Sequence, residues 1–229
     1  MKRFFILLVF TVGIGTAHSQ ENVIDSLTQQ LTKHHLSDTT LVSILNLLSY
    51  EYQWVDFNKS LEYANRALQL ADSLSYKKGM AEASYRSAHS FWALGNAEVA
   101  IEKGLDAVKL GTEINAPKII AEANRILAMC YRDQLDIETA RVCIQQAIDI
   151  STKQSDWDLL SRSFNVAGII VQHQNNNDSA IYLYEKALEI SSDHRTSQFH
   201  VSHILSNMAE CYLATDIDKS LDLFKRALQ

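Results

Sequence analysis

The feature that most constrains this chain is a set of small residues that returns every 40 positions. One set is Ser60, Ala100, Ala140, Ala180 and Ser220, and another is Ala67, Ala107, Ala147, Ala187 and Ala227. An apolar set keeps the same step at Leu68, Val108, Ile148, Leu188 and Leu228. Small residues also recur at Ala88, Ala128 and Gly168. Five units in one register indicate a repeat array, in which each unit packs mainly on its neighbours.

The clearest unit runs from Ala121 to Ile150. Its apolar residues follow a helical period on both sides of a short polar break at 133–136, which predicts two amphipathic helices joined by a tight turn. Ala128 and Ala140 allow the two helices to approach closely, and Tyr131 fills the gap beside them. One such hairpin cannot bury its apolar face alone, so it needs neighbours on both sides.

This spacing of small and aromatic residues resembles the tetratricopeptide repeat family over roughly residues 41–229. The resemblance implies an all-α fold, an α-solenoid that winds as a right-handed superhelix of five helical hairpins. The units are expected to start near residues 41, 81, 121, 161 and 201. Seven Gly, one Pro and almost no alternating Val/Thr-rich runs leave little room for a sheet.

Two departures from the family pattern narrow the resemblance. The family's usual period is about 34 residues and ends in a Pro, whereas this chain repeats every 40 residues and its one Pro, Pro117, lies elsewhere. We expect the extra residues to lengthen the second helix of each hairpin, because the apolar stripe continues at Leu70, Leu110, Ile150 and Ile190. Caps for these second helices are expected at Asp56 or Asn58, Asn96, Asp136, Asn177 or Asp178, and Asp216.

Residues 1–19 have the composition of a signal peptide. Lys2 and Arg3 precede an apolar run that ends near Gly15, and Ala17-His18-Ser19 fits a cleavage site. The run is shorter than the about 20 residues of a membrane span; a buried N-terminal helix is the alternative. Cleavage would leave an exported, periplasmic chain that begins at Gln20. Its net charge would change from −6 to −8, which gives no electrostatic reason to bind nucleic acid.

Residues 20–40 are expected to hold a lead helix and a break. Ile24, Leu27 and Leu31 form one stripe of a helix over 21–36, and Ser37–Thr40 breaks it and caps the next helix. This helix would cover the first repeat of the array at 41–229. At the other end we expect truncation, because a stable solenoid finishes with a polar outer face. Leu221, Phe224 and Leu228 would instead face solvent.

No arrangement of residues for catalysis or cofactor binding appears, so we expect a non-enzyme without a cofactor or metal. His200 and His203, spaced as i and i+3, offer a metal site together with His194, but no acidic or thiol ligand accompanies them. We therefore expect surface imidazoles. Glu82 and Glu122 lie 40 residues apart and are expected to be solvated rather than acid–base partners. Whether Cys130 and Cys143 form a disulfide stays open.

The binding surface is expected on the concave face, which the first helices line in the tetratricopeptide family. Mapped through the 40-residue register, the speculative groove residues are Tyr85, His89, Trp92, Arg125, Arg132, Arg162 and Asn165. The three arginines and Asn165 would form a cationic strip suited to a carboxylate or another anion. The aromatic residues offer flat apolar contact. The alternative is that these arginines are ordinary solvated charges of a helical array.

The predicted function is recognition of a protein, peptide or other ligand. The opening of the mature chain has a helix containing Asp25-Ser26-Leu27, a break at Asp38-Thr39 and then a segment that ends in LSYEY at residue 52. This layout resembles exported bacterial tetratricopeptide sensors, in which an array precedes a membrane span and a histidine kinase or helix-turn-helix output domain. The leading hypothesis is such a sensor domain, with its output domain outside this chain and membrane contact only through a downstream span. The alternative is a free-standing periplasmic scaffold that binds peptide segments of partner proteins. An enzyme with its active site on the solenoid is a distant third.

Overall fold

The computed structural model describes residues 14–32, 37–194 and 196–228, and every regular element in these ranges is an α-helix. The helices are, in chain order, α1 (Ile14–Leu31), α2 (Asp38–Tyr52), α3 (Phe57–Ser73), α4 (Lys77–Ala93), α5 (Ala97–Glu113), α6 (Pro117–Asp133), α7 (Ile137–Gln154), α8 (Trp157–His173), α9 (Asn177–His194), α10 (Gln198–Tyr212) and α11 (Ile217–Ala227).

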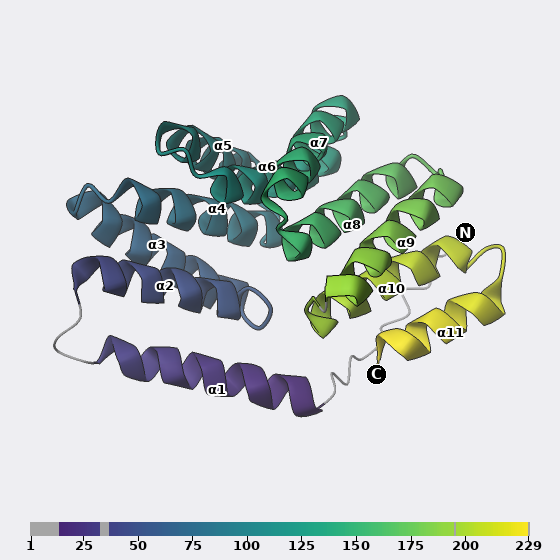
Figure 1. Cartoon of the computed structure of the whole chain (residues 1–229), viewed down its shortest axis with the longest axis horizontal. Coiled ribbons are helices and arrows are strands. Elements are labelled where there is room, and N and C mark those ends of the chain that lie inside the picture. The colour runs from purple at the N-terminus through teal and green to yellow at the C-terminus, as the bar shows by residue number, and fades with distance from the viewer. Residues whose placement is uncertain (1–13, 33–36, 195, 229) are drawn as a thin grey trace.

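From α2 onward the helices pack as five consecutive hairpins. The pairs are α2–α3, α4–α5, α6–α7, α8–α9 and α10–α11, and each first helix also contacts the first helix of the next hairpin. In Figure 1 the hairpins follow an arc from α2–α3 on the left, over α6–α7 at the top, to α10–α11 on the right. The predicted all-α solenoid of five hairpins is therefore confirmed.

The 40-residue small positions lie where the two helices of a hairpin touch. Ala100, Ala140 and Ala180 are fully buried, and Ser60 and Ser220 occupy the same place in the first and last hairpins. In these two hairpins the serine hydroxyl donates to a carbonyl of the preceding helix, Ser60 to Ser49 and Ser220 to Ala209. A small side chain is needed here because close-packed helices leave no volume for a larger one.

Gly168 of α8 lies against the Tyr184 ring of α9 in the fourth hairpin. Tyr184 is fully buried and stands where Ala64, Gly104 and Ile144 stand in the earlier units. A Cβ on Gly168 would lie 2.4 Å from the Tyr184 ring. In the fourth hairpin, therefore, a large residue on α9 packs against a glycine on α8, which leaves room for it.

The longer second helices explain the 40-residue period. Helices α3, α5, α7 and α9 contain 17 or 18 residues each, as predicted. The buried residue in the added turn is one position later than the expected stripe, at Ala71, Gly111, Ser151 and Ser191. The expected stripe residues Leu70, Leu110, Ile150 and Ile190 are only half-buried.

Capping side chains and left-handed turn residues fix the ends of the helices. Asp56, Asn96, Asp136 and Asp216 accept hydrogen bonds from first-turn amides, as predicted. For α9 the prediction was one or two residues late, because Asn176 is the acceptor and Ser179 N donates to it. The six turns from α3–α4 to α8–α9 each contain one residue with positive φ, namely Ser75, Gly95, Asn115, Leu135, Ser155 and Asn175.

The lead helix is present but its bounds differ from the prediction. Helix α1 ends at Leu31, five residues before the expected end, and packs on α2 with Ile24, Leu27 and Leu31 half-buried. The Ser37 hydroxyl accepts from Thr40 N and caps α2. Most of the predicted signal peptide lies outside the described residues, so cleavage after Ser19 stays a prediction. Within the part of the chain that the structure describes, no helix is both long and apolar enough to span a bilayer.

Candidate functional site on the inner face of the arc

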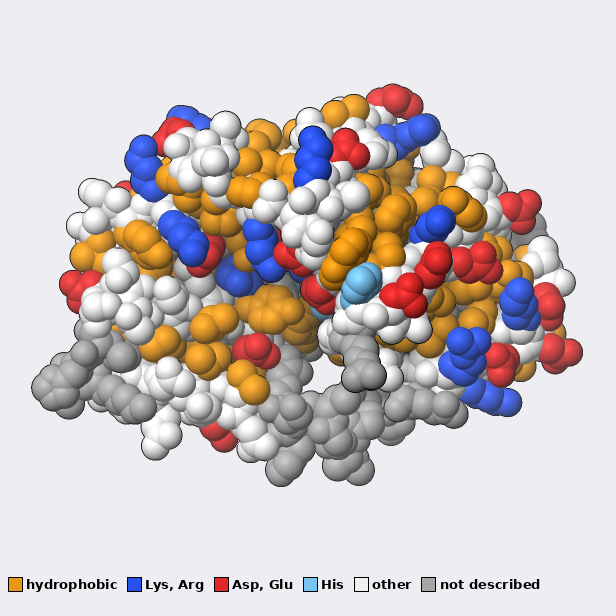
Figure 2. Space-filling model, viewed as in Figure 1, with side chains coloured by type: hydrophobic (Ala, Val, Ile, Leu, Met, Phe, Trp, Pro, Cys, Tyr) orange, Lys and Arg blue, Asp and Glu red, His pale blue; other side chains and the backbone are white. Residues whose placement is uncertain are grey.

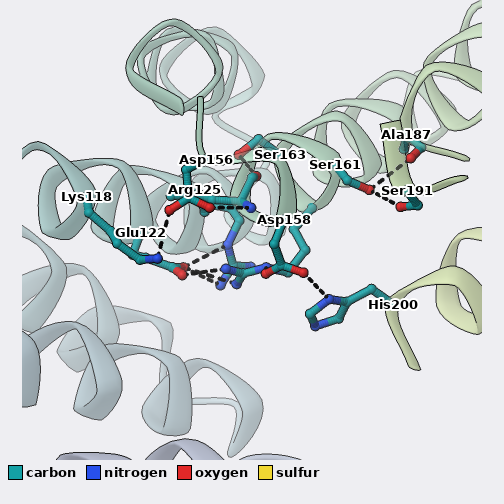
Figure 3. Close-up of polar contacts among 12 residues, drawn as sticks. Lys118, Glu122, Arg125, Asp156, Asp158, Ser161, Ser163, Ala187, Ser191 and His200 are labelled. Carbon is teal, nitrogen blue, oxygen red and sulfur yellow. Dashed lines mark hydrogen bonds and ion pairs between the residues drawn. The ribbon is translucent and has the colours of Figure 1, made fainter. Parts of the chain in front are cut away.

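A buried ion network joins the first helices of three hairpins on the inner face of the arc. At its centre lies Glu122 of α6, which is 5% exposed. Arg125, one turn later on α6, donates to Glu122 Oε2 from Nε and Nη2 at 3.3 and 3.1 Å. Arg162 of α8 donates to the same carboxylate at 2.6 Å through Nη2 and 3.2 Å through Nη1. Figure 3 shows the Glu122 carboxylate facing this group of guanidinium nitrogens.

The network continues to α10 through Asp158. Arg162 Nε donates to Asp158 Oδ2 at 3.0 Å, and Asp158 Oδ1 lies 3.0 Å from His200 Nδ1. His200 is 6% exposed, so the prediction of a surface imidazole was wrong for this residue. The reason is the arc itself, which brings α10 against the start of α8 (Figure 3). Among the described residues, no group of three or more His, Cys, Asp or Glu side chains is placed to hold a metal ion.

The charges of this network set the protonation states of its members. Burial alone would raise the pKa of Glu122, but the charges of Arg162 and Arg125 outweigh it and hold this pKa well below its usual range. Burial also opposes ionisation of Asp158, yet the hydrogen bond from His200 and the charge of Arg162 lower its pKa to about 2. Both carboxylates are therefore ionised at neutral pH, and each faces a cation.

Two periodicities of the sequence build the network. Glu122 and Arg125 are i and i+3 on one helix, which places both on one face. Glu122 and Arg162 are 40 residues apart, so they hold the same register position on neighbouring inner helices. The expectation that Glu122 is solvated was wrong, because an acidic residue and a basic residue at one register position meet across the helix interface. At the α6 and α8 N-termini, Lys118 pairs with Asp156 at 2.7 Å (Figure 3).

Beside the network lies a small polar cavity of about 10 Å³, room for about one water molecule. Its lining comes from α2, α4, α6 and α8 and from the turn after α2: Tyr50, Gln53, Tyr85, Arg86, His89, Glu122, Arg125, Ile126 and Arg162. Two buried nitrogen atoms in this lining, Arg86 Nε and His89 Nδ1, have no hydrogen-bond partner among the described residues. Burial and the nearby Arg125 charge lower the pKa of His89 to about 3, so its ring is neutral at physiological pH.

An aromatic cluster connects the first hairpin to the last across the inner face. Trp54, in the turn between α2 and α3, packs edge-on against Phe199 of α10 with ring centroids 4.6 Å apart. The His200 and His203 rings lie 5.8 and 6.0 Å from Trp54, and His89 of α4 lies 6.0 Å away on another side. Figure 2 shows charged and imidazole side chains side by side in the middle of this face, between orange apolar surfaces.

The seven predicted groove residues fall into three groups. Tyr85, His89, Arg125 and Arg162 line the same small cavity. Trp92 Nε1 and Arg132 Nε both donate to the Asp133 carboxylate, at 2.7 and 2.8 Å. Asn165 accepts from Asn207 of α10 at 2.9 Å. The predicted cationic strip is thus charge-balanced in its centre, since Glu122 and Asp158 face Arg125 and Arg162.

Sequence reasoning missed Asp158, Arg86 and Trp54 as parts of this face. A signal for Asp158 was present, because an acidic residue four positions before Arg162 lies on the same face of a helix. Trp54 gave no usable signal, since its contacts with α10 involve residues about 145 positions later. The cysteines carry free, buried thiols, and burial raises the pKa of Cys130 to about 12. Cys130 and Cys143 therefore act as small apolar side chains in the third hairpin.

Comparison with known proteins agrees with this geometry. The tetratricopeptide repeat model matches residues 119–193, which span α6 to α9. No curated protein sequence matches the chain significantly. One similar solved structure is BtubC (BKLC) from P. vanneervenii, 19% identical, covering 92% of this chain and 87% of that one with a TM-score of 0.65.

Two further similar structures are Rap proteins. The apo form of RapI is 18% identical and covers 93% of this chain and 77% of that chain, with a TM-score of 0.66. A Rap protein in complex with competence and sporulation factor is 12% identical and covers 91% of this chain but 57% of that one, with a TM-score of 0.76. At these identities the likeness establishes the solenoid fold.

Proposed function

We propose that this chain, which carries tetratricopeptide repeats, is a recognition protein that holds a peptide segment of a partner on the inner face of its arc. The observation that carries the proposal is the buried ion network from Arg125 through Glu122, Arg162 and Asp158 to His200. A buried ion pair is weak evidence for stability, because desolvation offsets most of its attraction. A network that links α6, α8 and α10 instead fixes the positions of the side chains around it.

The inner face offers a ligand hydrogen bonds and aromatic contacts, and its arginines do not give it a net positive charge. Arg125 and Arg162 face carboxylates, and Arg86 stacks on Tyr50 and Tyr85 with distances of 5.1 and 5.0 Å to the ring centroids. An uncharged or weakly charged peptide segment fits such a surface better than a strongly acidic one. The Rap protein bound to competence and sporulation factor supports this proposal, because a solenoid of similar fold forms that complex.

The finer proposal is that this recognition serves an exported bacterial sensor, whose output domain lies outside this sequence. Lys2, Arg3, the apolar run and Ala17-His18-Ser19 support export. A free-standing periplasmic scaffold is the second candidate. Cell fractionation followed by N-terminal sequencing tests the export step: a periplasmic chain that begins at Gln20 supports it, and an intact Met1 on a cytoplasmic chain contradicts it.

Photocrosslinking tests the binding face directly. Glu82 lies on α4, in register with Glu122, and it is half-buried without a described ion pair. Replacing Glu82 with benzoylphenylalanine should crosslink a partner in cells of the source organism, whereas the same replacement of the exposed Glu189 on α9 should not. Equal crosslinking from both positions, or crosslinking from Glu189 alone, would place the binding surface elsewhere.

A further inference from the structure

The contact of Trp54 with α10 has the geometry of an occupied aromatic pocket. The Phe199 and His203 rings of α10 meet edge to face with centroids 4.5 Å apart, and these two rings and His89 of α4 lie 4.6–6.0 Å from the indole. Edge-to-face contacts at 4.5–7 Å are a favoured arrangement of aromatic rings. The pocket is therefore shaped for a flat aromatic side chain, and the chain's own Trp54 fills it.

The segment that carries Trp54 packs inward, unlike the matching positions of the next hairpins. Its turn, from Gln53 to Asp56, contains no residue with positive φ, and it shares this with the α10–α11 turn, whereas each of the six turns from α3–α4 to α8–α9 is closed by one such residue. Residues at the same register position in the next three hairpins, Leu94, Gln134 and Gln174, are exposed. Inward packing at this position thus distinguishes the first hairpin among these four.

Close to Trp54 lie two buried polar atoms that have no hydrogen-bond partner among the described residues. Arg86 Nε and His89 Nδ1 are buried without partners, and both residues line the water-sized cavity that Gln53 also borders. Buried polar atoms in native proteins almost always have a partner. These two nitrogens therefore indicate a group, supplied by water or by a ligand, that completes the site.

We infer that Trp54 is a placeholder: a peptide ligand inserts an aromatic side chain between His89, Phe199 and His203, displaces Trp54, and presents backbone polar groups to Arg86 and His89. This inference rests on the proposed function and specifies its ligand class, a peptide with an exposed aromatic residue. In the absence of a ligand, Trp54 of the chain itself would then occupy the pocket and block it.

The test is an NMR titration of the full chain with N-acetyl-tryptophanamide, with N-acetyl-leucinamide as the apolar control. The tryptophan probe should shift the Trp54 indole N–H signal, and the leucine probe should not. Trp54→Ala should raise the affinity for the tryptophan probe by about tenfold or more, because it removes the internal competitor. Phe199→Ala, which removes a pocket wall, should abolish binding.

Trp157→Ala is the matched control, because Trp157 stacks on His194 at 4.2 Å and takes no part in the pocket. It should leave the probe affinity unchanged. If the probe binds Trp54→Ala but leaves the Trp54 signal of the parent chain in place at saturating concentration, Trp54 is a permanent brace and the inference is wrong. Crosslinking from Glu82 then still tests the proposed function on its own.

Discussion

The third hairpin and the last hairpin are built on the same register but are buried to different extents. Among first helices, α6 buries eleven of its seventeen residues and α10 six of its fifteen; among second helices, α7 buries five of eighteen and α11 two of eleven. The same register position shows the contrast directly: Ile148 of α7 is half-buried and Leu228, just after α11, is 51% exposed.

The difference shows how stability is distributed in a solenoid. Helices α6 and α7 contact hairpins on both sides, while α10 and α11 contact a described hairpin on one side only. In such arrays the free energy is approximately a sum of unit and nearest-neighbour terms. In the 229-residue chain the same substitution should therefore cost more in the third hairpin than in the last one, and the last hairpin should open first.

The largest expected effect comes from breaking the ion network in the centre. Arg162→Ala leaves the buried Glu122 and the half-buried Asp158 with one cation fewer, and removing one partner of a buried pair costs about 3–5 kcal/mol of unfolding free energy. Arg226→Ala in α11 removes an exposed partner of Asp222 and should cost about 0–1 kcal/mol. Urea unfolding followed by circular dichroism measures both, and similar losses would mean that the network is solvated.

A smaller but sharper contrast is expected at the position where the helices of a hairpin touch. Ala140→Leu forces added methylenes into a fully buried contact and should cost about 1–3 kcal/mol or more. Ser220→Leu makes the matched change in the last hairpin and should lower the global stability less, because α11 can move away. Glu138→Leu, at an exposed site in the first turn of α7, is the control with little effect.

Thermal melts decide this prediction. Equal losses for Ala140→Leu and Glu138→Leu would show that the 40-residue register is misassigned. Equal losses for Ala140→Leu and Ser220→Leu would show that the last hairpin unfolds together with the centre.

Lowering the pH should reduce the unfolding free energy by protonating His89 before Glu122 and Asp158 are protonated. The pKa of His89 is lowered to about 3 in the folded chain, mainly by burial, against about 6.5 when unfolded. The unfolded state therefore binds more protons between these values, and stability that is fully present above pH 6.5 is lost as pH falls. The expected loss is about 1–2 kcal/mol by pH 5.

Substituting His89 separates its contribution to this loss of stability from that of other titrating groups. Burial also lowers the pKa of His203, which adds a loss of the same sign in the last hairpin. Urea unfolding at pH 7 and pH 5 should show a smaller difference for His89→Gln than for the parent chain. Glu122 and Asp158, whose pKa values are lowered, contribute loss only below about pH 4. An unchanged pH dependence in His89→Gln would contradict the assignment.

The sequence alone was sufficient for the fold because the fold repeats. Ala100, Ala140 and Ala180 recur at one spacing, and each is fully buried between two helices, so one physical constraint is visible several times. The starts of the second helices were predictable within one or two residues for the same reason, since a polar cap is needed at each of them.

The site was predictable only in part because its contacts do not repeat. Tyr85, His89, Arg125 and Arg162 were placed together from the register, but the state of their charges depends on Glu122 and Asp158. Acidic residues stand at the same register positions in earlier hairpins, Glu82 and Asp38, so the register did not show which carboxylates meet an arginine. The Trp54–Phe199 contact depends on the curvature of the whole arc. That curvature sums small rotations between hairpins, which no local pattern records.

The smallest expected effect compares two matching helix caps. Asp136 accepts from Thr139 N at 3.1 Å at the start of α7, and Asp216 accepts from Lys219 N at 3.0 Å at the start of α11. Replacing either by Ala should cost about 1 kcal/mol, the usual effect of removing an N-cap. The two losses of stability should nevertheless affect the exchange of different amides, because the third hairpin contacts neighbours on both sides and the last hairpin contacts a described neighbour on one side.

Native-state hydrogen exchange distinguishes them amide by amide. Asp136→Ala should lower the protection of the most stable amides in α6 and α7, since the central hairpin opens only when the array unfolds. Asp216→Ala should accelerate exchange in α11 alone and leave α6 unchanged, because among the described helices α11 packs on α10 alone and is expected to open below the global unfolding free energy. If Asp216→Ala instead leaves exchange in α11 unchanged and lowers protection in α6, the last hairpin belongs to the same cooperative unit as the centre. The two regions would then differ in burial but not in local stability.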